Sequence, residues 1–282
     1  MDLMAGKTVL VTGATNGIGF ITALELAKMD ATVLMVARDE KKGRAKLEEI
    51  RKVVPHAKLE LLLADLSSMA SIRQLATNVT AKYSSLDVLV NNAGAFYSDR
   101  RVSKDGFEMT FALNHVGYFL LTDLLLETLK RGKNARVISV SSGAHLAAKI
   151  NFDDLQLEKK FSGWAAYCTS KLMNVLFTKE LARRLAGTGV TANCLHPGFV
   201  NTGFAGGSSD FMGRMLNFIK NFAAITPEKG AETMIYLSSS AEVANVTGEY
   251  FEKKKIAKVN PIALDSSIAK RLWDVSEKLT AS

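Results

Sequence analysis

Short apolar runs rich in valine, leucine and isoleucine recur along the first two thirds of the chain. Six runs are typical of buried strands: Lys7–Thr12, Thr32–Val36, Leu59–Leu63, Val88–Asn91, Val137–Val140 and Val190–Leu195. Segments with helical spacing, such as Ile18–Met29 and Glu40–Val53, lie between them. This alternation predicts a Rossmann-type, doubly wound α/β fold, with a parallel sheet covered by helices on both faces. No linker rich in Pro, Gly or Ser interrupts it, so we predict one domain over residues 1–282.

The first predicted strand runs directly into a glycine-rich turn. The turn contains Gly13, Gly17 and Gly19, and a predicted helix follows it. Backbone N–H groups at such a helix start bind phosphate, and glycine lets the backbone approach closely. The spacing G-x-x-x-G-x-G differs from the dinucleotide fingerprint G-x-G-x-x-G, and a plain tight turn would also explain the isolated pattern. Its place after the first strand favours a nucleotide site.

Two residues at the end of the second strand give conflicting predictions about the cofactor. The forked guanidinium of Arg38 suits the 2′-phosphate of NADP, whereas the Asp39 carboxylate suits the free ribose diol of NAD. Asp39 also fits the N-cap of the next helix, so the pattern favours Arg38 and NADP(H). Asp65, at the end of the third strand, is divided in the same way between an adenine contact and helix capping.

The spacing Tyr-x-x-x-Lys occurs twice. Tyr167 and Lys171 lie in a helical segment, where side chains four apart share one face and an ammonium stabilises a phenolate. Tyr250 and Lys254 lie in a strand-like run that leads into a charge cluster, where alternation and solvation explain both residues. We therefore expect Tyr250 to have no catalytic role.

The order of these motifs resembles the classical short-chain dehydrogenase/reductase family. The glycine turn, Asn91-Asn92-Ala93-Gly94, Val140-Ser141-Ser142, Tyr167 to Lys171 and Pro197-Gly198 follow one another as in that family, from about residue 7 to 251. The resemblance implies about seven parallel strands between helical layers, and a catalytic tetrad of Asn114, Ser142, Tyr167 and Lys171. It implies that the cofactor contacts Gly13, Thr15, Asn16, Gly17, Ile18, Gly19, Arg38, Asp65, Leu66, Asn92, Ala93, Gly94, Tyr167, Lys171, Pro197, Gly198, Val200 and Thr202.

The tetrad suits the transfer of a hydride between a nicotinamide and a carbonyl carbon, because one proton must then be managed on the oxygen. Tyr167 is the expected acid and base, with its pKa lowered by Lys171 and the oxidised nicotinamide. Ser142 is expected to bind the substrate oxygen and Lys171 the nicotinamide ribose. The family resemblance alone gives Asn114 its role in a water relay to solvent.

Two departures from the minimal family pattern are the Ala37-Arg38 pair and the long interval from Ser142 to Tyr167. Both resemble the retinol dehydrogenase branch, which implies a lipophilic alcohol and its aldehyde or ketone as substrates. Steroids, quinones and pigment precursors remain alternatives. A nucleotide-sensing regulatory protein without turnover is the alternative from another class, but it would not need all four tetrad residues.

Residues 199–226 combine glycines with many apolar side chains, and the series Phe211, Met215, Phe218 and Phe222 follows one helical face. We predict that this segment is a loop or lid over a lipophilic substrate. Ordinary core packing or contact with a second subunit would also bury such a face. Nearby basic residues suggest peripheral contact with an anionic membrane as an extension of this prediction.

Composition narrows the remaining classes. Apolar residues make up 48% and charged residues 23% of the chain, as in soluble globular proteins. The net charge of +8 is spread along the chain among acids, which does not favour nucleic acid as a partner. Two cysteines and the lack of zinc-ligand spacing indicate a reducing compartment without a metal site. Neither a signal peptide nor a transmembrane run is recognised, so a cytoplasmic location is expected, with a homo-oligomer as one option.

Overall fold

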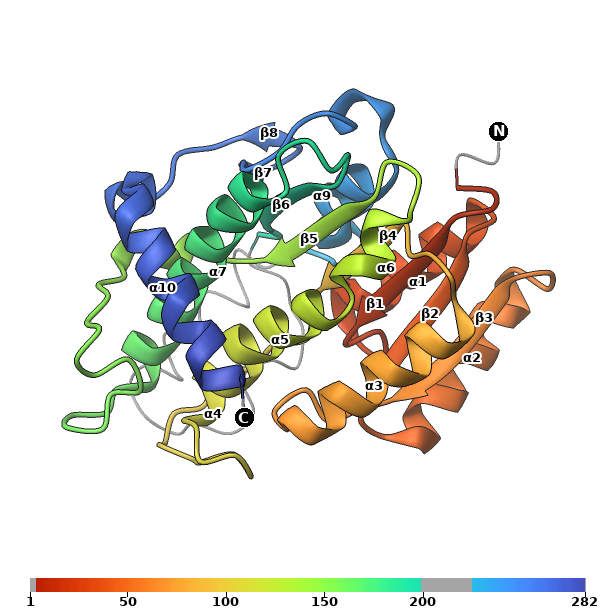
Figure 1. The fold of residues 1–282 in the computed structure, drawn as a ribbon. Helices are drawn as coiled ribbons and strands as arrows, with labels where there is room; N and C mark the ends of the chain where they lie inside the picture. Colours follow the sequence, from red (N-terminus) through yellow and green to blue (C-terminus); the bar gives the residue numbers. More distant parts are fainter. Residues whose placement is uncertain (1–3, 199–224, 282) are drawn as a thin grey trace.

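The computed structural model describes residues 4–198 and 225–281, and Figure 1 shows them as one sheet between layers of helices. The strand order is β3-β2-β1-β4-β5-β6-β7-β8. The strands are β1 (Thr8–Thr12), β2 (Thr32–Ala37), β3 (Lys58–Leu63), β4 (Val88–Asn91), β5 (Arg136–Val140), β6 (Thr191–His196), β7 (Tyr250–Glu252) and β8 (Lys255–Ile256). The single α/β domain with a doubly wound sheet is therefore confirmed.

Most helices lie in the connections between the strands, and the last two follow β8. The α-helices are α1 (Gly17–Lys28), α2 (Glu40–Val53), α3 (Met69–Lys82), α4 (Met109–Phe111), α5 (Gly117–Leu124), α6 (Leu126–Lys130), α7 (Gly163–Arg184), α9 (Pro227–Ser239) and α10 (Ser266–Thr280). A π-helix, η1 (Ala112–Val116), joins α4 to α5. The 3₁₀ helices are η2 (Gly143–Ala147), η3 (Ala241–Val243) and η4 (Pro261–Leu264).

The six strands predicted from apolar runs are all present, with ends that differ by one residue at most. The described sheet has eight strands rather than about seven, because β8 pairs antiparallel with β7 at its edge. Lys253 and Lys254 between them have φ of 50° and 63°. This left-handed turn reverses the chain after the three residues of β7.

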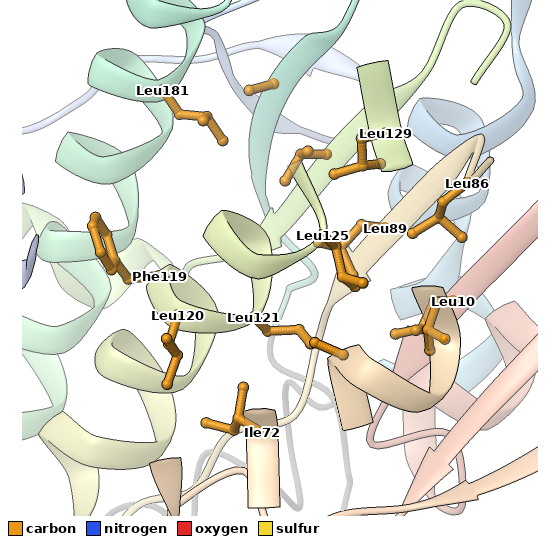
Figure 2. Close-up of a cluster of buried hydrophobic side chains, with 14 of the residues drawn as sticks. Leu10, Ile72, Leu86, Leu89, Phe119, Leu120, Leu121, Leu125, Leu129 and Leu181 are labelled. Atoms are coloured by element: carbon orange, nitrogen blue, oxygen red, sulfur yellow. The ribbon is translucent and has the colours of Figure 1, made fainter. Parts of the chain in front are cut away.

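The two faces of the sheet bury alternate residues of each strand. Leu10 of β1 and its register partners Leu34 and Leu89 belong to a core shared with α3, α5 and α7, part of which Figure 2 shows. Val9 and Val11 belong to the opposite core, with α1, α2 and α9. Alternation of side chains along a strand explains this division.

The chain order reverses between β1 and β4, since β2 and β3 extend to one side of β1 and β5 to β7 to the other. A crevice opens at such a switch point, at the carboxyl ends of the parallel strands. The turns after β1, β2, β4, β5 and β6 all lie at this edge, and they carry the predicted motifs.

Candidate active site

A cavity of about 780 Å³ lies at this carboxyl edge. Its lining includes three residues of the predicted tetrad, namely Ser142, Tyr167 and Lys171. Most of the predicted cofactor residues line it as well: Gly13, Thr15, Asn16, Gly17, Ile18, Arg38, Asp65, Leu66, Asn92, Ala93, Gly94, Pro197 and Gly198. Gly19 and Asn114 are not among the residues that line it, and Val200 and Thr202 lie outside the described residues.

The glycine turn adopts a backbone conformation that favours glycine at three positions. Gly13 and Gly17 have φ of 65° and 51°, which side chains rarely tolerate. A Cβ on Gly19 would stand 2.4 Å from the Gly13 carbonyl oxygen. The hydroxyl of Thr12 accepts hydrogen bonds from the backbone nitrogens of Asn92 and Ala93, at 2.8 and 3.0 Å, and so joins this turn to the β4 turn. The start of α1 thus faces the cavity, where its N–H groups favour an anion.

The structure gives Arg38 and Asp39, at the end of β2, different roles. The Asp39 carboxylate caps α2, accepting a hydrogen bond from the Lys42 backbone nitrogen at 2.9 Å. Arg38 lines the cavity. Burial raises the pKa of Asp65, but hydrogen bonds from Ser67 and the positive charges of Arg38 and Lys104 hold it below its usual value. Asp65 is therefore a carboxylate beside Arg38.

Asn114 lies in the π-helix η1, with none of its surface exposed. Its amide oxygen accepts a hydrogen bond from the Ala95 nitrogen at 2.9 Å. Its amide nitrogen donates to the Ala95 carbonyl at 3.0 Å and to the Ser170 hydroxyl at 3.1 Å. The hydroxyl of Ser170 donates to the Tyr167 carbonyl at 2.8 Å. Asn114 thus joins the β4 turn to the part of α7 that carries Tyr167 and Lys171.

Burial has opposite effects on the two titratable groups of the predicted tetrad. It raises the pKa of Tyr167 to about 12, although a hydrogen bond with Ser142 opposes the shift. It lowers the pKa of Lys171 to about 7. Burial therefore acts against the expected lowering of the Tyr167 pKa, because removal from water disfavours the phenolate; the lowering by Lys171 and the oxidised nicotinamide stays a prediction. Tyr167 is a protonated acid at neutral pH.

Lys171 is 2% exposed, and its Nζ donates to the Val140 carbonyl at 3.1 Å. The Nζ lies 5.6 Å from the ring centroid of Tyr167. Asn174, one turn further along α7, donates to the same carbonyl at 3.1 Å. The ammonium is thus held next to the phenol ring at the end of β5.

Aromatic and aliphatic side chains form the wall of the cavity around Tyr167. The ring of Phe96 meets the Tyr167 ring edge to face at 6.0 Å, and the ring of Trp164 lies 6.2 Å away on the same helix. Tyr97, Leu113 and Leu146 complete this part of the lining. Sequence analysis did not identify these residues, because a single aromatic residue in a loop or helix start carries no periodic signal.

His196 is a second residue that sequence reasoning did not place in the site. It ends β6 directly before Pro197 and lines the cavity, 7% exposed. Burial lowers its pKa, although the Glu252 carboxylate opposes the shift. Its position next to the Pro197-Gly198 motif was the available signal.

Tyr250, from the second Tyr-x-x-x-Lys match, lies in β7 and is buried. Its ring packs against His145 at 4.6 Å. Lys254, its partner in the pattern, forms an ion pair with Glu232 at 3.3 Å. The two residues of this match therefore make separate contacts, unlike Tyr167 and Lys171.

The predicted lid over 199–226 lies almost entirely outside the described residues, and it stays a prediction.

Among the helices between residues 4 and 198 and between 225 and 281, none has the length and apolar character needed to cross a membrane.

Comparison with known proteins agrees with this geometry. A family model described as short chain dehydrogenase matches residues 7–212. Human retinol dehydrogenase 13 is 43% identical over 281 residues, which cover 97% of this chain and 84% of that protein. Human retinol dehydrogenase 14 is 41% identical over 298 residues, covering 98% and 86% of the two chains.

Solved structures show the same arrangement. An uncharacterized protein from Mycobacterium paratuberculosis is 34% identical, with a TM-score of 0.81 over 99% of this chain and 94% of its own. The RhlG/NADP active-site complex of Pseudomonas aeruginosa is 27% identical, with a TM-score of 0.69 over 88% and 95% of the two chains. Since the family model covers well over half of the sequence and the retinol dehydrogenases match nearly all of it, this protein belongs to the short-chain dehydrogenase family, in its retinol dehydrogenase-like branch.

Proposed function

We propose that this oxidoreductase uses NADP(H) to interconvert a lipophilic alcohol, of the retinol type, and its aldehyde or ketone. The observation that carries the proposal is the single cavity in which Tyr167, Ser142 and Lys171 meet Arg38 and the start of α1. A nucleotide would have phosphate contacts at one end of this cavity and a proton donor at the other. Retinol dehydrogenases among the relatives support the substrate class.

The protein residues would handle the proton and the orientation of the substrate. The nicotinamide supplies a hydride when bound. Tyr167, kept protonated by burial, would donate its phenolic proton to the carbonyl oxygen during reduction and accept it back during oxidation. Ser142 would donate a hydrogen bond to the same oxygen, and Lys171 would hold the ribose. Asn114, buried beside Gly94, would stabilise the internal end of a proton path.

Arg38 supports NADP(H) rather than NAD(H). The guanidinium lines the cavity, while the neighbouring Asp39 carboxylate is occupied by its cap of α2. Charge-assisted hydrogen bonds between Arg38 and a 2′-phosphate would contribute about 1.5–3 kcal/mol. The NADP complex of a relative in the same fold is consistent with this preference.

The wall around Tyr167 supports a lipophilic substrate. Phe96, Trp164 and Leu113 present apolar surface where the carbonyl must bind, and apolar burial stabilises a ligand by about 25 cal/mol per Å². The proposal includes four further features: a lid over 199–226, contact with an anionic membrane, self-association and a cytoplasmic location.

A substrate and cofactor screen tests the proposed function. Wild-type protein is assayed for NADPH and NADH oxidation with retinal, long-chain aldehydes, steroids and quinones. We expect the highest kcat/KM with NADPH and a long lipophilic aldehyde. Tight NADPH binding with no turnover of any carbonyl would instead favour a nucleotide-sensing protein.

A further inference from the structure

The residue after Asn114 makes a contact that the reaction does not use directly. Asn114 and His115 are neighbours in the π-helix η1, a rare conformation that inserts an extra residue into a helix and frequently marks functional sites. The Asn114 amide bonds Ala95 and Ser170. The neighbouring His115 imidazole is 1% exposed, and it contacts Ser276 of α10 and the Asn174 side chain of α7.

The hydrogen bond between His115 and α10 has a defined direction. The Nε2 atom of His115 lies 2.9 Å from the Ser276 hydroxyl oxygen. That hydroxyl donates its only proton to the Leu272 carbonyl, 2.9 Å away. With this proton on the Leu272 carbonyl, Ser276 accepts from the imidazole, which then donates through Nε2–H. Burial lowers the pKa of His115 to about 4, so the ring is neutral and carries a single N–H near pH 7.

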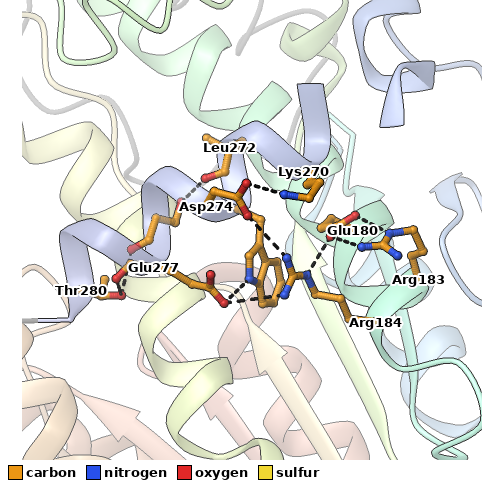
Figure 3. Close-up of polar contacts among 10 residues, drawn as sticks. Glu180, Arg183, Arg184, Lys270, Leu272, Asp274, Glu277 and Thr280 are labelled. Carbon is orange, nitrogen blue, oxygen red and sulfur yellow. Dashed lines mark hydrogen bonds and ion pairs between the residues drawn. The ribbon is translucent and has the colours of Figure 1, made fainter. Parts of the chain in front are cut away.

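Helix α10 gives this acceptor a fixed position. The Trp273 ring stacks on Phe177 of α7 at 5.9 Å and meets Phe119 of α5 at 4.9 Å. Figure 3 shows Arg184 of α7 between the carboxylates of Asp274 and Glu277 on α10, each 3.7 Å away. The guanidinium also lies over the Trp273 ring, at 4.4 Å. Ser276, within this contact region, is thus held against the helices that form the site.

We propose that His115 is a positioning residue, whose hydrogen bond to Ser276 holds η1 in the conformation that keeps the Asn114 amide on Ala95 and Ser170. The C-terminal helix α10 would then stabilise the conformation of the active site through η1, although α10 contributes no residue to the cavity lining. This inference rests on the proposed function of the same site. Loss of the bond would let η1 relax, and it would move Asn114 relative to Tyr167 and Lys171.

Substitutions at His115 separate positioning from simple packing. His115→Leu removes the donor, whereas His115→Gln keeps an amide N–H near the place of Nε2. We expect kcat to fall about tenfold in the leucine variant, because the Ser276 hydroxyl loses its hydrogen-bond donor in a buried position. The KM for NADPH should stay within about twofold. The glutamine variant should recover most of this loss. In an Asn114→Ala background, His115→Leu should have little further effect, because His115 acts through Asn114.

A pair of serine variants provides the matched control. Ser276 and Ser238 are each 1% exposed, and each donates to the carbonyl four residues earlier, Leu272 and Met234 respectively. Only Ser276 accepts from a histidine. Ser276→Ala should therefore lower kcat, while Ser238→Ala should leave it unchanged at similar stability. This pair decides the question if His115→Leu does not fold.

The side-chain amide resonance of Asn114 in an NMR spectrum gives a readout that does not need turnover. We expect this resonance to shift and its protons to exchange faster in Ser276→Ala, but not in Ser238→Ala. If both the Asn114 amide resonance and kcat are unchanged in Ser276→Ala, the inference is overturned. Absence of wild-type turnover would contradict the proposed function alone, since the resonance would still decide whether His115 and Ser276 position Asn114.

Discussion

Replacing Lys171 by methionine tests whether a buried ammonium in the site destabilises the folded protein. Lys171 is 2% exposed, and burial lowers its pKa from 10.5 to about 7. Each pKa unit corresponds to about 1.4 kcal/mol, so protonated Lys171 lowers the free energy of unfolding by an amount on the order of 5 kcal/mol. Methionine has a similar volume without the charge. Asn174 still donates to the Val140 carbonyl after the substitution, so this acceptor stays satisfied.

The pH dependence follows from the direction of this shift. Below pH 7 the folded and unfolded chains both carry the proton, and the destabilisation is fully present. Between pH 7 and 10.5 the unfolded chain keeps a proton that the folded chain has released, so stability rises with pH. The wild type should gain about 2–3 kcal/mol between pH 7 and 9 from this group. Lys171→Met should lack this gain.

Urea unfolding followed by circular dichroism at pH 6, 7.5 and 9 measures both proteins. Tyr167, with a pKa of about 12, does not titrate between pH 6 and 9, and the remaining groups are common to both proteins, so the difference between the two curves isolates Lys171. We expect Lys171→Met to be more stable by about 2–4 kcal/mol at pH 6, to approach the wild type at pH 9, and to have lost turnover. Parallel pH curves, or a methionine variant less stable at pH 6, would refute the reasoning.

Four further outcomes follow from the site. Arg38→Ala should reduce the NADPH-over-NADH ratio of kcat/KM about ten- to a hundredfold, and an unchanged ratio would exclude Arg38 as the selective residue. Asp39→Ala should lower the free energy of unfolding by about 1 kcal/mol through the lost cap, with the same cofactor ratio; a changed ratio would return Asp39 to the cofactor site. Tyr250→Phe should keep turnover within a fewfold, whereas a loss as severe as that of Tyr167→Phe would show that the second pair takes part in catalysis. Across aldehydes of rising chain length, kcat/KM should rise, because each buried methylene should lower its activation free energy by up to ~0.8 kcal/mol. A preference for short polar carbonyls would contradict the lipophilic site.

The strands were predictable because a parallel strand that is buried on both faces consists of a local run of apolar residues, as Val88–Asn91 illustrates. The glycine turn could be placed for a similar reason, since Gly13 and Gly17 adopt positive φ at a fixed distance after the first strand. The cap at Asp39 was also a local signal, and the structure confirms it. Local sequence thus predicts elements whose cause lies within a few neighbouring residues.

Features that depend on distant parts of the chain could not be predicted in the same way. The π-helix at Asn114 forms against Ala95, Ser170 and Ser276, and the last of these is 161 residues away from its partner His115. The pKa of Tyr167 rises because surrounding elements exclude water, and the Tyr-x-x-x-Lys spacing carries no information about this burial. The edge strand β8 is two residues long, too short for any periodic signal.

The most direct test of the proposed reaction compares wild type and Tyr167→Phe in two measurements on the same samples. The first is turnover of NADPH with a long-chain aldehyde, and the second is the Kd for NADPH by cofactor fluorescence. Loss of the proton donor should lower kcat by about 10²–10⁴-fold, while the Kd stays within about threefold of the wild type. Retention of turnover in Tyr167→Phe, with NADPH still bound, would contradict the assignment of Tyr167 as the acid and base of this enzyme.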